Sequence, residues 1–167
     1  TWHAMPNAGH HALVELERRG TLHTLITQNI DGLHQKAGSS PERIVEIHGT
    51  IHEVVCMACG DRNPMEFALA RVRAGEEDPP CRECGGILKS ATISFGQGLV
   101  VEDLMRAERA SLSVFLIAAV VPLAKECGAS VIIVNAEPTE MDPLADVVLR
   151  GAIGELLPPV IGSCAEN

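Results

Sequence analysis

Four of the six cysteines occur in two Cys-x-x-Cys pairs, a spacing typical of zinc sites in proteins. The members of the pairs are Cys56, Cys59, Cys81 and Cys84. Glycine follows each pair, at Gly60 and Gly85, and lets the backbone turn so that both thiolates of a pair face one ion. Four thiolates complete a tetrahedral shell with no open position, so the sequence predicts one structural Zn2+ ion. Two disulfides or unbound thiols are the alternative.

Polar side chains follow two short apolar runs in the sequence. The runs are residues 22–26 and 130–134, and we predict both as buried strands. The polar residues that follow them are Gln28, Asn29, Asp31 and Asn135. In open α/β sheets, ligands bind beyond the carboxyl ends of the strands, so these side chains are the first candidates for a binding site.

Helices are predicted next to these strands. Apolar residues at helical spacing predict a helix over residues 8–19, which Asn7 caps and Gly20 ends. A second helix is predicted over residues 112–125, and Pro122 bends it or divides it into two pieces. Each predicted strand therefore has a helical segment before it.

The last part of the chain continues this order. A third strand is predicted over residues 146–149, and then a short helix that starts at Ile153 and ends before Pro158. Apolar strands that alternate with helices indicate an α/β fold with a doubly wound parallel sheet. Residues 53–89 lose this alternation and carry the paired cysteines, so we interpret them as a small inserted module.

Composition and charge indicate which kinds of partner the protein is unsuited to bind. Hydrophobic residues make up 46% of the 167 residues and aromatic residues only 2%, which predicts an aliphatic core. The net charge of −9 repels nucleic acid, and few aromatic side chains are available to stack on bases. The longest apolar run, residues 114–124, is too short to span a bilayer, and no signal peptide is recognisable. We expect a cytoplasmic protein with neither a nucleic-acid nor a membrane partner.

The chain resembles the sirtuin family in an ordered set of motifs that covers nearly its whole length. Besides the paired cysteines, the motifs are Thr27–His34 (TQNIDGLH), Glu46–Gly49 (EIHG), Ser94–Gln97 (SFGQ) and Ile133–Thr139 (IVNAEPT). Each is weak alone, but their shared order and approximate spacing are specific. The resemblance implies a Rossmann-like NAD-binding domain formed by residues 1–52 and 90–167, with the zinc-binding module at residues 53–89.

Sirtuins are NAD-dependent protein-lysine deacylases, so the resemblance implies that activity and an acyl-lysine protein or peptide as substrate. In the family, the acyl oxygen attacks the nicotinamide ribose and nicotinamide leaves. A histidine then acts as general base on a ribose hydroxyl, and free lysine and O-acyl-ADP-ribose are released. By its place in the Ile-His-Gly motif, that histidine is His48. An imidazole titrates near neutral pH and suits this role, although a histidine at this position could also simply pack at a strand end.

The resemblance also implies ligand contacts. The residues that match NAD-binding positions are Gln28, Asn29, Asp31, Ser111, Asn135, Ala152 and Ile153. The residues that match contacts to the acyl-lysine or to its peptide are Ile93, Phe95, Gly96, Val114 and Phe115. Amide and carboxylate groups can bond the carboxamide and hydroxyls of a nicotinamide riboside, and an extended peptide can pair with backbone on either side of it. The structural alternatives are a turn at Asp31 and a core position for Phe95.

Two pieces of the family pattern have no counterpart in these 167 residues. They are the N-terminal strand with its Gly-Ala-Gly phosphate loop and the strand that leads to a Gly-Thr-Ser motif, of which Ser111 alone can be matched. Both contribute to NAD binding, so we expect the sequence to omit residues of a longer protein, and little NAD turnover if it does not. Two other functions stay open: a zinc-ribbon binding module without catalysis, and a sirtuin-like protein ADP-ribosyltransferase.

Overall fold

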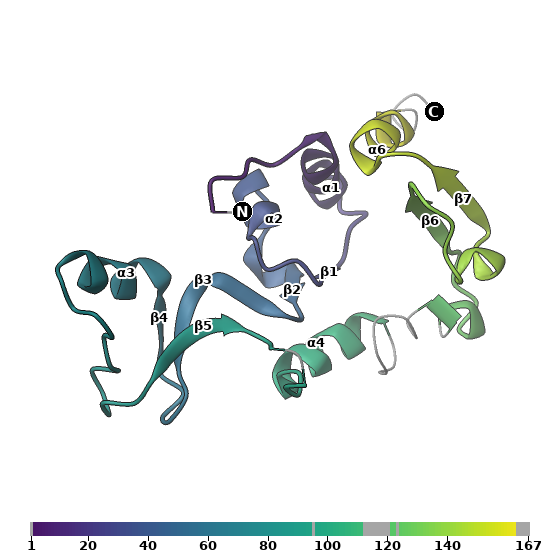
Figure 1. Ribbon diagram of the computed structural model, residues 1–167. Helices are drawn as coiled ribbons and strands as arrows, with labels where there is room; N and C mark the ends of the chain where they lie inside the picture. Colours follow the sequence, from purple (N-terminus) through teal and green to yellow (C-terminus); the bar gives the residue numbers. More distant parts are fainter. Residues whose placement is uncertain (1, 95, 112–120, 123, 163–167) are drawn as a thin grey trace. The chain divides into compact units, whose positions relative to one another are not determined.

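The computed structural model describes residues 2–94, 96–111, 121–122 and 124–162, without the side chains of residues 108–111. The chain packs as two compact units, whose elements are labelled in Figure 1. The first unit comprises Thr1–Ala4, Ile26–Gly32 and Glu46–Val100. The second comprises Met5–Leu25, Leu33–Val45 and Val101–Asn167.

The first unit is built on an antiparallel sheet in the order β4–β3–β5. Its elements are β3 (Gly49–Cys56), β4 (Arg62–Pro64), α3 (Met65–Arg73) and β5 (Leu88–Thr92). β-Branched residues are frequent in β3, which suits a pleated and half-buried strand. Val54 and Cys56 on β3 and Ala91 on β5 are buried in the core of this unit.

A bulge interrupts the pairing of β3 with β5. Gly49 pairs with Thr92 and Val54 pairs with Ser90. Between these two pairs the chain advances five residues along β3 but only two along β5. The additional residues of β3 between these two points have no β5 partner, and pairing of β3 with β4 starts only at Glu53. Such bulges bend a strand and redirect its side chains.

Two short strands lead into the first unit. β1 (Leu25–Thr27) pairs with β2 (Ile44–Glu46), and the polar segment that follows β1 is bound to the start of β3. The carbonyl of Thr27 accepts the N–H of Ile47 at 3.0 Å, and the carbonyl of Ile30 accepts the N–H of Ile51 at 3.0 Å. These bonds bring the two motifs TQNIDG and EIHG together.

The second unit contains the other described helices and a parallel strand pair. Its elements are α1 (Ala8–Arg18), α2 (Leu33–Ala37), η1 (Pro41–Arg43), α4 (Val101–Ser111), β6 (Ile132–Asn135), η2 (Asp142–Leu144), β7 (Val147–Arg150) and α6 (Ile153–Gly162). α1 begins where the sequence predicts, because Asn7 Oδ1 accepts the N–H of His10 at 3.2 Å and caps the first turn. β6 and β7 pair in parallel from Ile132 with Val147 to Asn135 with Arg150.

α6 corrects one expectation from the sequence. The helix does not end before Pro158 but continues through Pro158 and Pro159 to Gly162. The two prolines supply no N–H donor to the helix. The helix packs along α1, where Ile161 is buried and its carbonyl accepts Arg19 Nη1 at 2.8 Å. The predicted helix over residues 112–125 lies largely outside the described residues.

The buried hydrophobic residues of the described part are aliphatic, apart from two cysteines. This agrees with the aliphatic core that the composition predicts. No helix in the described part of the chain has both the length and the apolar character that crossing a bilayer requires.

Candidate active site and metal centre

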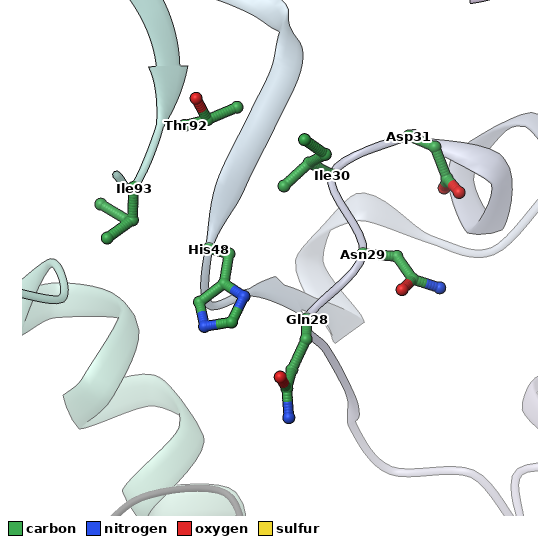
Figure 2. Close-up of a pocket in the computed structure, with 7 residues that line it drawn as sticks. All are labelled: Gln28, Asn29, Ile30, Asp31, His48, Thr92 and Ile93. Atoms are coloured by element: carbon green, nitrogen blue, oxygen red, sulfur yellow. The ribbon is translucent and has the colours of Figure 1, made fainter. Parts of the chain in front are cut away.

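One cavity of the first unit, about 360 Å³ in volume, gathers residues from separate motifs (Figure 2). It is lined by Gln28, Asn29, Ile30, Asp31, His48, Thr92 and Ile93. Five of these seven residues are among the site residues that the sequence predicts. The two that it missed, Ile30 and Thr92, directly adjoin predicted residues. Ile30 lies within the motif Thr27–His34, which is the signal that would have found it, whereas Thr92 lies outside every motif.

Local hydrogen bonds hold the two walls of this cavity. Thr27 Oγ1 accepts the N–H of Asn29 at 3.1 Å, which turns the chain after β1. Ile47 is buried and bound to Thr27, so it anchors the half-buried His48 at the start of β3. The carbonyl of His48 accepts the N–H of Ile93 at 2.9 Å, which adds the segment after β5 as the third wall.

The side chains in the cavity differ in direction. Figure 2 shows the imidazole of His48 and the amide of Gln28 pointing to the same side, whereas Asn29 and Asp31 point away from His48. A half-buried imidazole beside amide and carboxylate groups can take up a proton while neighbouring groups hold a polar ligand. Apolar walls of Ile30 and Ile93 complete the type of lining that small-molecule sites have.

The segment after β5 has an internal clamp that the sequence did not reveal. Lys89 Nζ donates to the carbonyl of Thr92 and to Gln97 Oε1, both at 2.9 Å. Gln97 Oε1 also accepts the N–H of Ser94 at 3.2 Å. The clamp fixes the backbone on both sides of Ile93.

Three of the predicted NAD-binding residues come together in the second unit. Asn135 ends β6, and its carbonyl accepts the N–H of Gly151 at 3.4 Å, directly before Ala152 and Ile153. Asn135 Nδ2 donates to the carbonyl of Glu137 at 2.9 Å. The start of α6 therefore lies beside the end of β6.

The other predicted site residues lie after β5 and in or after α4, partly outside the described residues. Gly96 lies in a turn with φ of 81°, where the N–H of Gln97 donates to the carbonyl of Ser94 at 2.9 Å. Ser111 is the last residue of α4, and its side chain is outside the described part. Three predicted substrate contacts also lie outside the described residues: Phe95, Val114 and Phe115.

The four paired cysteines converge at the end of the antiparallel sheet. Their sulfur atoms all lie within 4.8 Å of one another. Two similar tight turns bring them there: the N–H of Gly60 donates to the carbonyl of Cys56 at 3.0 Å, and the N–H of Gly85 donates to that of Cys81 at 2.9 Å. The first cysteine pair starts at the end of β3, and the second pair comes just before β5. Because these two strand ends are paired in the sheet, both turns lie at one point.

The cluster fits a tetrahedral zinc ion. The Sγ atoms of Cys56 and Cys84 are 3.5 Å apart, and those of Cys59 and Cys81 are 3.7 Å apart. Four sulfurs bound tetrahedrally at about 2.3 Å lie about 3.8 Å from one another. The backbone N–H groups of Cys59 and Ala58 lower the pKa of Cys56 to about 6, whereas contacts with the neighbouring sulfur atoms raise the pKa of Cys59 to about 12 and also raise the pKa of Cys84. Four crowded thiols of this kind are deprotonated together only when a cation binds them. The cysteines are thus positioned to hold one structural ion.

Comparisons with known proteins agree with this geometry. The family model for the Sir2 family matches residues 1–120. NAD-dependent protein deacetylase 2 of Streptomyces coelicolor is 47% identical over 171 residues, covering 95% of this chain and 71% of that protein. NAD-dependent protein deacylase 2 of Pyrobaculum aerophilum is 40% identical over 173 residues, covering 96% of this chain and 66% of that protein.

A solved structure described as Sir2 bound to acetylated peptide superimposes with a TM-score of 0.87 at 26% identity. The superposition covers 99% of this chain and 74% of that chain. The predicted α/β, Rossmann-like fold with a four-cysteine cluster is confirmed by these neighbours and by the cysteine geometry. By sequence, fold and motif order, the chain belongs to the Sir2 family, the sirtuins.

Proposed function

We propose that the protein is an NAD-dependent protein-lysine deacylase, which transfers the acyl group of a modified lysine to ADP-ribose and releases nicotinamide. The observation that carries this proposal is the cavity in which His48 lies with Gln28, Asn29 and Asp31. The relatives whose names state NAD-dependent deacetylation or deacylation support the same reaction.

We propose separate sets of residues for the nicotinamide end and for the adenosine end of NAD. Amide and carboxylate groups of Gln28, Asn29 and Asp31 would hold the nicotinamide and its ribose. The positions proposed for the adenosine end and the adjoining ribose are Ser111, Asn135, Ala152 and Ile153. When bound, NAD supplies the ADP-ribose that accepts the acyl group and nicotinamide as the leaving group.

His48 is the proposed catalytic residue. Its half-buried imidazole would accept the proton of a ribose hydroxyl and return it to the departing product. The backbone of His48 is held on both sides, through buried Ile47 and through the bond from Ile93, so the ring is carried on a fixed support. Such fixed geometry is what a general base requires.

The acyl-lysine would enter beside the segment after β5. We propose Ile93 and Phe95 as contacts of the acyl-lysine. The backbone of Gly96 and the segment of Val114 and Phe115 would pair with the extended peptide on its two sides. The Lys89 clamp supports this assignment because it fixes the backbone that would receive the peptide.

The proposed function goes with a domain organisation and a cellular location. We propose that residues 53–89 form the zinc-binding module, between the two parts, 1–52 and 90–167, of the NAD-binding domain. Reduced thiols in a metal site suit a reducing compartment, which supports a cytoplasmic location.

The proposal is tested by the products formed from NAD and an acetyl-lysine peptide. Mass spectrometry should show the deacetylated peptide, in which lysine has lost its acetyl group, together with acetyl-ADP-ribose and nicotinamide, in equal amounts. ADP-ribose attached to protein would indicate an ADP-ribosyltransferase instead. No product from folded, zinc-loaded protein would leave the binding module as the function.

A further inference from the structure

His52 is a polar side chain beside the pocket to which the proposed mechanism gives no role. It lies on β3 and is exposed, and its Nε2 is 2.8 Å from the carbonyl oxygen of Asp31. Its ring also lies against Trp2, with ring centroids 4.9 Å apart and planes inclined by 41°. His52 therefore connects a pocket residue to an aromatic side chain of the same unit.

The bulge in β3 explains why His52 reaches the pocket loop. His52 lies between the points where β3 pairs with β5, and it precedes Glu53, where pairing with β4 starts. Its neighbour Ile51 donates its N–H to the carbonyl of Ile30, and Thr50 Oγ1 accepts the N–H of His52 at 3.2 Å. The unpaired part of the strand is thus bound to the loop instead, and it turns the imidazole towards Asp31.

Gly32 leaves the space that the imidazole occupies. A Cβ atom at this position would lie 2.7 Å from Cδ2 and 2.8 Å from Nε2 of His52. Gly32 also has φ of 66°, a conformation that other residues rarely adopt. Loop and ring are therefore fitted to each other at the end of the segment Gln28–Gly32.

We propose that His52 is a positioning residue for NAD. Its Nε2–H donates to the Asp31 carbonyl and fixes the end of the segment Gln28–Gly32, while the ring of Trp2 holds the imidazole in place. Backbone bonds already fix Thr27 and Ile30, and the bond from His52 extends this support to Asp31. The inference rests on the proposed function, since it assigns His52 to the NAD side of the pocket and not to the peptide side.

Two substitutions separate hydrogen bonding from packing. His52→Phe keeps a ring against Trp2 but removes the donor, whereas His52→Gln keeps an amide donor of similar reach and removes the ring. Glu53→Gln is the matched control, because Glu53 is the next residue on β3 and its carboxylate binds Arg62 and not the loop. Steady-state kinetics give KM for NAD, KM for an acetyl-lysine peptide and kcat. Emission from Trp2, the single tryptophan among the 167 residues, reports the ring contact.

For His52→Phe we expect KM for NAD to rise about fivefold, the factor of one hydrogen bond of typical net strength, with KM for the peptide unchanged. The wavelength of its Trp2 emission maximum should stay close to that of the parent, because a ring still covers the indole. His52→Gln should shift Trp2 emission yet keep KM for NAD close to that of the parent and of Glu53→Gln. A parental KM for NAD in His52→Phe, or an equal loss in His52→Gln, would overturn the inference and leave the proposed function intact. No NAD-dependent turnover in the parent would overturn the proposed function, and the inference with it.

Discussion

The backbone N–H of Ile93 donates to the carbonyl oxygen of His48 at 2.9 Å. This bond joins the start of β3 to the residue that follows β5, next to the pairing of Gly49 with Thr92. The proposed general base and the proposed acyl-lysine contact therefore share one backbone support. Changes to that support should affect chemistry and stability together, whereas changes at the edges of the pocket should affect one substrate at a time.

Gly49 is the position where this support tolerates least change. A Cβ atom there would lie 2.0 Å from the carbonyl oxygen of Ala91, and φ is 73°. We expect Gly49→Ala to lower the free energy of unfolding by about 3 kcal/mol, measured by chemical denaturation. Gly60→Ala is the control: φ is similar at 77°, but nothing lies within 4 Å, so the loss should be about 1 kcal/mol. Equal losses in the two variants would contradict the predicted clash.

The four-cysteine cluster should hold one zinc ion per chain and depend on every ligand. We expect Cys59→Ser to lose the ion and to lower the melting temperature by more than about 10 °C, because binding of a structural ion stabilises the folded state. Cys127→Ser is the control, since Cys127 is exposed and outside the cluster. Metal analysis and thermal unfolding check both. Full zinc content in Cys59→Ser would contradict the site.

The hydrogen bonds of Lys89 should strengthen binding of the acetyl-lysine peptide. Lys89→Met keeps the aliphatic stem but removes the donor to Thr92 and Gln97. We expect KM for an acetyl-lysine peptide to rise about fivefold, with KM for NAD little changed. Steady-state kinetics with each substrate varied in turn test this. A rise confined to KM for NAD would show that the clamp acts on the other side.

Asp146 should make the second unit sensitive to acid. The ammonium of Lys125 and the N–H of Val131, each 2.7 Å away, lower the pKa of Asp146 from its ordinary value of 3.8. A lowered folded-state pKa means that this stabilisation is present above pH 3.8 and is lost as pH falls through the lower folded value. The melting temperature of Asp146→Asn should therefore lie below that of the parent at neutral pH and approach it in acid. A pH-independent difference would contradict the role of the charge.

Local rules predicted those features that a few neighbouring residues determine. The cap at Asn7 marks the start of α1, and the spacing of the cysteines predicted the cluster. The strand predicted over residues 22–26 is found at Leu25–Thr27, displaced towards the polar residues that line the cavity. The cap and each tight Cys-x-x-Cys turn are determined within a few residues along the chain, whereas the antiparallel sheet brings the two cysteine pairs together.

Features that depend on distant partners could not be predicted in this way. The bulge that redirects His52 exists only in the pairing of β3 with β5, and the clamp of Lys89 depends on where Gln97 folds back. α6 continues through Pro158 and packs against α1, a contact between distant segments that no local propensity conveys. The family resemblance predicted five of the seven residues that line the pocket, whereas the hydrogen bonds that support them became visible only in the structure.

Release of nicotinamide from NAD, with and without an acetyl-lysine peptide, tests the central claim most directly when it is measured for the parent and for His48→Ala. We expect peptide-dependent release in the parent. In His48→Ala the steady-state rate over many turnovers should fall on the order of 100-fold or more, because the general base acts after nicotinamide leaves and its loss stops each molecule after one release. His23→Ala is the control, since His23 is exposed and its imidazole is bound to Thr24; it should retain the parental rate. Peptide-dependent release that persists at the parental rate in His48→Ala would contradict the proposed role of His48.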